Sequence, residues 1–192
     1  MKTKRQRELA ETFLSGIDEN DRPLYREIIS CLSGLGYMPK KEGQRISFKH
    51  GLHNKQIAKM GMSRSKKNPR PLFMLRFSAC REYSKKFADV VSEAVKKYPE
   101  DARSCLADGC NFCKGEPLSH LYSCTLTGGL TNGLTSGLTS GLTSGLTGSE
   151  KYHCGAYALE IPDLTYDDID EIKRLLNENH AYLMKHEAGI EI

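Results

Sequence analysis

The chain has 192 residues, of which 39% are hydrophobic, and it carries a formal net charge of +4. This length is sufficient for one domain with a hydrophobic core. The sequence does not open with a basic and apolar leader, and no apolar run approaches the roughly 18 residues that would span a bilayer. We therefore expect a single domain over residues 1–192, located in the cytoplasm and without a membrane partner.

The charges are distributed unevenly along the chain. Between Tyr37 and Arg70 there are ten Lys or Arg residues and one acid, whereas the segment from Gly155 to the end has nine acids and three bases. Such a concentration of positive charge favours a surface that binds anions, and a solvated face without a partner is the alternative. Nucleic acid is one anionic partner that fits this charge, although no aromatic residues are interleaved with the basic ones.

Two helices are predicted at the start of the chain. Thr3 can cap the first, over Lys4–Ser15, and Gly16 can end it. The second begins at Asp21, and its apolar residues recur at helical spacing as far as Gly34. The proline two residues after Asp21 suits the first turn of a helix.

From Tyr37 the apolar pattern becomes that of strands. Residues 45–49 alternate polar and apolar side chains, residues 50–54 have turn composition, and a second run follows over residues 56–62, so this segment is predicted to be a hairpin. Leu72–Phe77 is the most apolar strand candidate and is expected in the middle of a sheet. Ser84 then begins a third helix that Pro99 ends.

A low-complexity tract, Thr127–Ser149, repeats a four-residue unit of the type Thr-Ser-Gly-Leu. Single leucines among so much glycine cannot bury enough surface to offset the cost of ordering the chain, so the tract is predicted to be a flexible insertion. Residues 121–124 and 152–157 on its two sides have strand composition. They are predicted to form a hairpin with the tract at its tip.

The last elements are a short strand that ends near Ile161 and a long acidic helix. Thr165 and Asp168 have the spacing of a capping box, and the apolar residues that follow recur at helical spacing. The order of elements predicts an α+β fold with an antiparallel sheet flanked by helices. A cysteine-rich metal-binding module and the long flexible hairpin insertion complete the expected architecture.

Five of the seven cysteines lie between residues 105 and 154. In a cytosolic chain so dense a cluster favours a bound metal over disulfides. Cys110 and Cys113 have the CxxC spacing of a zinc knuckle, with a glycine two residues further on. The module is predicted over residues 103–126 and 150–157, with Zn²⁺ held by Cys105, Cys110, Cys113 and Cys154, and with Cys124, His120 and His153 as substitute ligands.

Three alternatives to zinc remain for this cluster. Cys105, Cys110 and Cys113 followed by a distant cysteine have the spacing of a plant-type [2Fe–2S] site. Free cysteines without a metal are a second alternative. A thioredoxin-like redox motif is the third, but the residues from Lys114 to Pro117 cannot open the helix that it requires.

His50 and His53 lie at the predicted hairpin tip, between Lys49 and Lys55. Two histidines on a tight turn can bind a metal, or they can hold a phosphate together with Lys59 and Arg64. A turn surface without a function is the alternative. The candidate anion-binding set is therefore Lys49, His50, His53, Lys55, Lys59 and Arg64.

Several stretches together resemble an uncharacterised family of cytosolic proteins, common in Clostridia and related Firmicutes, with a cysteine-rich and zinc-ribbon-like segment. Besides the cysteine cluster they are Leu24–Gly36, Ser47–His50, His53–Lys59, Arg76–Cys80, Cys154–Tyr157 and Asp167–Asp170. The resemblance covers nearly all of the chain except Thr127–Ser149, and it implies no established activity. The order of elements is also similar to that of small α+β domains of the iron-chaperone-like type.

No pattern in the sequence indicates a catalytic residue. The sequence therefore predicts a non-enzymatic, cytosolic zinc-binding protein whose basic hairpin binds an anionic partner. An iron–sulfur redox or sensor protein that uses Cys105, Cys110, Cys113 and a distal cysteine is the alternative.

Overall fold

The computed structural model describes residues 3–63, 65, 67, 69–98, 121–126 and 149–187. These residues form two compact units. The first comprises the chain up to Phe77 together with the segment from Ala158, and the second comprises Ser78–Tyr157. The predicted α+β fold with an antiparallel sheet is confirmed.

The first unit is built on a five-stranded antiparallel sheet with the order β1-β2-β3-β4-β7. Its strands are β1 (Tyr37–Glu42), β2 (Arg45–His50), β3 (Gln56–Met62), β4 (Pro71–Leu75) and β7 (Leu159–Ile161). The predicted hairpin corresponds to β2 and β3, and the apolar strand β4 lies between two neighbours, as expected. Strand β1 was not predicted as a separate element.

Two rows of apolar side chains cross the sheet on one face. Antiparallel pairing aligns Ile46 with Met60, Phe73 and Ile161, and it aligns Phe48 with Ala58, Leu75 and Leu159. All eight residues are buried. Side chains on a strand alternate between faces, so this register produces the hydrophobic core of the unit.

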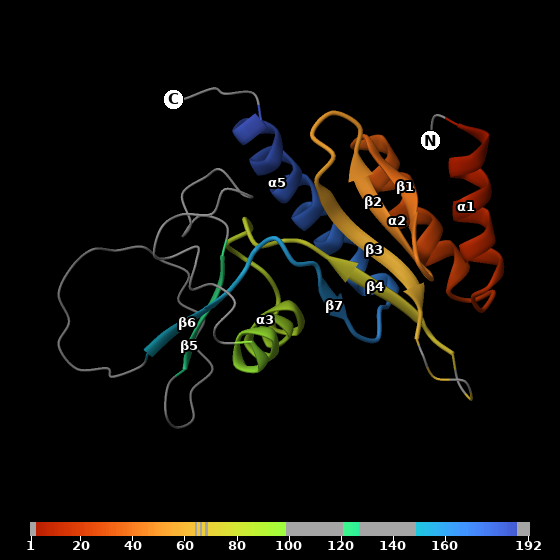
Figure 1. Ribbon diagram of the computed structural model, residues 1–192. Helices are drawn as coiled ribbons and strands as arrows, with labels where there is room; N and C mark the ends of the chain where they lie inside the picture. The colour runs from red at the N-terminus through yellow and green to blue at the C-terminus, as the bar shows by residue number, and fades with distance from the viewer. Residues whose placement is uncertain are drawn as a thin grey trace. The chain divides into compact units, whose positions relative to one another are not determined.

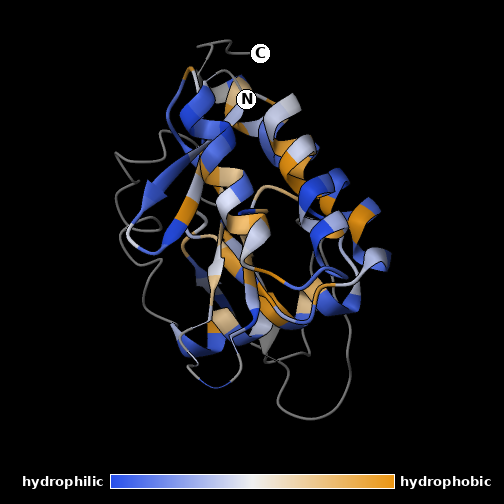
Figure 2. Ribbon diagram, turned by 90° about the vertical axis from the view of Figure 1, so that its right-hand side faces the viewer, coloured by the Kyte–Doolittle hydropathy of each residue, from blue (hydrophilic) through white to orange (hydrophobic). Residues whose placement is uncertain are grey.

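Helices α1 (Lys4–Ser15), α2 (Arg22–Gly34) and α5 (Ile169–Glu187) complete the first unit. Both α1 and α2 contact β1, and α5 contacts α2 and β3. Figure 1 shows α2 and α5 on the same side of the sheet. In Figure 2 these helices carry hydrophobic residues on one side and hydrophilic residues on the other, as amphipathic helices that cover a core do.

The predicted helix ends agree with the structure at several positions. Thr3 forms a capping box with Gln6, and Gly16 follows the end of α1. Thr165 and Asp168 form the predicted capping box, in the short 3-10 turn η2 (Tyr166–Asp168) that precedes α5. Asp21 stands at the N-cap of α2, where the second helix was predicted to begin, but its side chain makes no capping hydrogen bond.

The second unit contains α3 (Lys85–Lys97) and a two-stranded antiparallel sheet of β5 (Tyr122–Leu126) and β6 (Ser149–His153). Helix α3 contacts both strands. Tyr122 donates a hydrogen bond to the Tyr157 carbonyl oxygen at 3.1 Å, and Ser78 donates one to the Gly155 carbonyl oxygen at 3.0 Å. The residues predicted to flank the repeat tract are therefore paired, while residues 127–148 of the tract lie outside the described residues.

None of the helices in the described ranges is both long and apolar enough to cross a membrane.

Candidate anion-binding site

Three histidines and a tyrosine meet at one end of the five-stranded sheet. Tyr37, the first residue of β1, is paired in register with His50, the last residue of β2. The ring of His50 stacks on that of His53 at a centroid distance of 4.3 Å. The Tyr37 hydroxyl lies 3.2 Å from Nδ1 of His180, which comes from α5. We call these four residues the histidine cluster.

A glycine directly before β1, Gly36, leaves the space that the His50 ring occupies. Gly36 has φ +86°, a conformation that favours glycine, and a Cβ at this residue would lie 2.7 Å from Nε2 of His50. The Gly51 amide donates a hydrogen bond to the Gly36 carbonyl oxygen at 3.2 Å, which holds the two segments together. The close approach of the imidazole to the chain therefore depends on the absence of a side chain at residue 36.

Backbone hydrogen bonds set the tautomers of His50 and His53. The Leu52 amide donates to Nδ1 of His50 at 3.3 Å, and the Lys55 amide donates to Nδ1 of His53 at 3.1 Å. A neutral imidazole carries one hydrogen, so both neutral rings must carry it on Nε2. The two histidines thus have Nε2–H groups that can donate hydrogen bonds to an anion.

The same hydrogen bonds argue against a metal at His50 and His53. A histidine that binds a metal usually donates its second ring N–H to an acceptor, whereas here the second nitrogen of each ring accepts a hydrogen bond. Within the described residues, no group of three or more His, Cys, Asp or Glu is arranged to hold a metal ion. Of the two functions predicted for these histidines, the geometry favours the binding of an anion.

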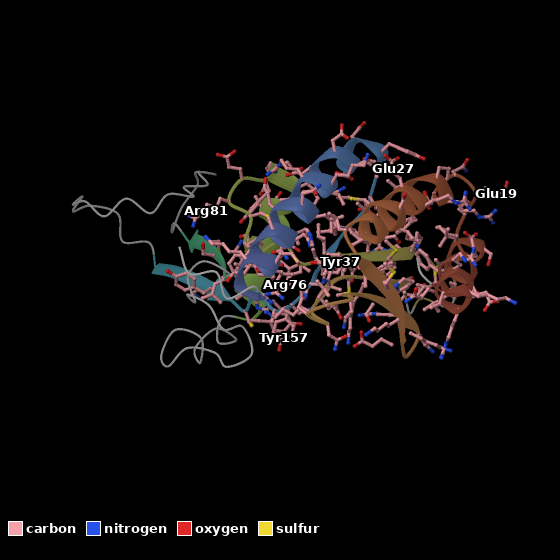
Figure 3. All side chains as sticks on the ribbon, turned by 90° about the horizontal axis from the view of Figure 1, so that it is seen from above. Glu19, Glu27, Tyr37, Arg76, Arg81 and Tyr157 are labelled. Carbon is pink, nitrogen blue, oxygen red and sulfur yellow. The ribbon has the colours of Figure 1, made fainter. Side chains whose placement is uncertain are left out.

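Arg76 brings a positive charge to the same end of the sheet. It follows β4 directly, and its amide donates a hydrogen bond to the Ile57 carbonyl oxygen at 2.7 Å. The residue is only 4% exposed. In the described part of the chain its guanidinium has no carboxylate partner, and its Nε makes no hydrogen bond. Figure 3 labels Tyr37 and Arg76 within the first unit.

The electrostatics of the cluster follow from burial and from Arg76. Burial raises the pKa of the Tyr37 hydroxyl, and the charge of Arg76 partly offsets this effect. Burial also lowers the pKa of His180, and the charge of His50 lowers it further. Near neutral pH the tyrosine is therefore protonated and His180 uncharged, whereas Arg76 carries a fixed positive charge.

Of the basic residues predicted to bind an anion together with the histidines, Lys59 does not lie with them. Lys59 is paired with Ser47 and neighbours two core residues along β3, so it belongs to the face of the sheet opposite the core, where it forms an ion pair with Glu42 at 3.3 Å. Lys49 neighbours His50 along β2, and Lys55 contributes the backbone amide described above. Arg64 lies outside the described residues.

The cysteine-rich module is only partly described. Cys105, Cys110, Cys113 and His120 lie outside the described residues. In the second unit Cys124 is paired with Lys151 on β6, whereas Cys154 directly follows β6 and packs, like Tyr152, against Leu121. Alternation along the strands places Cys124 on the face of Tyr122 and His153, and Cys154 on the other face.

Cys124 and Cys154 therefore cannot both bind one ion without rearrangement of the hairpin. They are separated by three residue positions along the ladder, or roughly 10 Å, in addition to facing opposite sides. The ring of His153, the other described substitute ligand, stacks on Tyr98, Tyr122 and Tyr157. Burial raises the pKa of the Cys124 thiol, and a hydrogen bond with Ser92 and the charges of Lys96 and Lys151 act against this effect.

Three residues of the site were not found from the sequence: Tyr37, Arg76 and His180. A signal existed for Arg76, because it is the one charged residue in the apolar run Leu72–Phe77. Tyr37 and His180 are 143 residues apart, and no local pattern links them.

Comparisons of the chain with protein-family models, with curated proteins and with solved structures found no match. The resemblance to a clostridial family therefore stays a prediction, and the function is argued from the site alone.

Proposed function

We propose that this protein binds an anionic partner through the histidine cluster and Arg76, without catalysing a reaction on it. The observation that carries this proposal is the side chain of Arg76, which is 4% exposed, has a buried Nε without a hydrogen bond and has no carboxylate partner in the described ranges. Taking an unpaired charge out of water costs several kcal/mol. A bound oxyanion would offset that cost, since a guanidinium can hold two oxygens of a phosphate or carboxylate at once.

The neighbouring groups suit the same ligand. The Nε2–H groups of His50 and His53 are hydrogen-bond donors, and neither ring needs to be charged in order to donate. The cluster thus combines one fixed positive charge with hydrogen-bond donors. This combination favours a small oxyanion group, and we propose a phosphate group, either free or carried by a larger partner such as a nucleic acid.

Titration calorimetry with inorganic phosphate and with sulfate tests the proposal. Arg76→Gln should weaken phosphate binding about tenfold or more, because a hydrogen bond to a charged group contributes roughly 1.5–3 kcal/mol. The matched control is Arg81→Gln, which removes an exposed arginine of the second unit and should leave the affinity unchanged. Retention on a heparin column at increasing salt extends the test to a polyanionic partner.

Two results would contradict the proposal. One is a wild-type protein that binds neither anion, and the other is an Arg76→Gln variant that binds phosphate as tightly as the wild type. The stability of the variant in phosphate-free buffer provides a second measurement. If Arg76 lacks a structural partner, Arg76→Gln should unfold at an equal or higher urea concentration, because it removes an uncompensated buried charge.

We also propose the structural zinc site that the sequence predicts. Its support is the spacing of Cys105, Cys110 and Cys113, together with Cys154 at the end of the β5–β6 hairpin. Four thiolates would close the coordination sphere, so the ion would stabilise the fold rather than act on a substrate. An iron–sulfur cluster on the same residues is the second candidate, favoured by the plant-type spacing.

A further inference from the structure

A pocket lies at the end of the same sheet opposite the histidine cluster. It is formed by the start of α2, the start of β4 and the loop that follows β7, and its volume is about 130 Å³. A cavity of about 150 Å³ can hold a molecule the size of benzene, so this pocket has room for a ligand of about six heavy atoms.

The charges around this pocket are predominantly negative. Asp21, Glu160 and Asp163 contribute three carboxylates, and Arg70 contributes one guanidinium. Arg70 lies 3.3 Å from Asp163 and neutralises that carboxylate, while Asp21 and Glu160 have no ion-pair partner in the part of the chain that the structure describes. The N-terminus of α2 adds about half a positive charge. The net charge of the groups around the pocket is therefore still negative, by more than one unit charge.

Tyr25 supplies a hydrogen-bonding group to the pocket. It lines the pocket and is 3% exposed, yet its hydroxyl makes no hydrogen bond to any residue within the described ranges. Burial raises its pKa, and the charge of Asp21 raises it further, so the phenol stays protonated. The side chain is buried, but its hydroxyl oxygen keeps some contact with solvent, so a ligand in the pocket can hydrogen-bond to it in place of water.

The remaining lining is apolar, with Leu72, Ile161 and Leu164 among its residues. A chain of methylene groups can pack against such side chains while a charged end reaches the carboxylates. We propose that this pocket binds a primary alkylammonium group, which either a small free diamine or the lysine side chain of a partner could provide. The Tyr25 hydroxyl would accept a hydrogen bond from the ammonium, and Asp21 and Glu160 would provide the opposite charge.

Binding of 1,4-diaminobutane, of N-acetyl-lysine amide and of butan-1-ol, each measured by NMR titration of the full chain, tests this inference. At least one of the two amines should bind saturably and butan-1-ol should not, and the tighter amine identifies the source of the group. Glu160→Gln should weaken amine binding roughly two- to fivefold, as expected for a partly exposed charge pair. Tyr25→Phe should weaken it about fivefold, the effect of one hydrogen bond.

Glu8→Gln is the matched control, because it removes an exposed carboxylate of α1 that does not line the pocket. Arg76→Gln should also leave amine binding unchanged, which keeps this inference separate from the proposed anion site. The inference is overturned if neither amine saturates, if butan-1-ol binds as tightly as the amines, or if Glu160→Gln and Tyr25→Phe bind the amine as the wild type does. Thermal melting of each variant confirms that it is folded.

Discussion

The position of the His50 imidazole depends on a glycine. Gly36→Ala should lower the free energy of unfolding by about 1–3 kcal/mol, because alanine rarely adopts a φ of +86° and its Cβ would lie 2.7 Å from Nε2 of His50. Urea unfolding measures this loss. Loss of phosphate affinity in a variant that is still folded would show that the displaced His50 takes part in binding.

Gly34→Ala is the matched control for this substitution. Gly34 is the last residue of α2, and a Cβ there would meet nothing within 4 Å. Alanine at that position should leave the stability unchanged or raise it by up to about 1 kcal/mol. Equal destabilisation by both substitutions would show that chain flexibility, rather than contact with His50, determines the effect.

His180 should make the first unit sensitive to acid. Its pKa is lowered by burial and by the charge of His50, whereas in the unfolded chain it titrates near 6.5. Above about pH 6.5 the residue is neutral in both states and has no effect. As the pH falls below that value the unfolded chain binds a proton that the folded chain binds less readily, so stability should fall towards the lower, folded-state pKa.

Urea unfolding in phosphate-free buffers at about pH 7.5 and about pH 5.5 measures this effect. His180→Gln can keep a hydrogen bond to Tyr37 but has no titrating group, so it should lose less stability between the two pH values than the wild type. An identical pH dependence in the two proteins would assign the acid sensitivity to other groups.

At the level of elements, the β5–β6 hairpin prevents two of the predicted zinc ligands from binding the same ion. Cys124 and Cys154 lie on opposite faces of the hairpin, so one ion can use only one of them. If Cys154 is the ligand, Cys154→Ser should reduce the bound zinc and lower the Tm, whereas Cys124→Ser should retain both. Metal analysis of the purified protein by mass spectrometry, with a visible spectrum of an anaerobic preparation, makes the measurement.

If instead Cys124→Ser loses zinc and Cys154→Ser retains it, Cys124 is the ligand. If both variants retain their zinc, neither cysteine of this hairpin binds the ion. A preparation with visible absorbance and bound iron would replace zinc with an iron–sulfur cluster. An unchanged Tm after removal of the metal by a chelator would contradict a structural role for zinc.

The sequence predicted elements well where their signals are local. The cap at Thr3 and the capping box at Thr165 and Asp168 are signals within four residues of sequence, and both helix starts were found from them. Strand β1 was missed because its residues Lys40–Glu42 are exposed and charged, so it lacks the apolar pattern of the interior strands. An edge strand needs less burial than its neighbours, and its pairing with β2 comes from the tight turn between them.

At the level of the whole molecule, the candidate site was only half predictable. His50 and His53 are three residues apart, and turn composition indicated them together. Their partners come from the start of β1, the end of β4 and the middle of α5, and only the fold brings these together. The density of basic residues was a poorer guide, since Lys59 is paired with Glu42 on the other face of the sheet.

Strand β4 has one arginine immediately before it and one immediately after it. Arg70 borders the acidic pocket, and Arg76 lies at the histidine cluster. Six residue steps along an extended strand separate their Cα atoms by roughly 20 Å. A single small zwitterion such as a free amino acid is far too short to span that distance, so amines and oxyanions should occupy the first unit as separate molecules and should not compete.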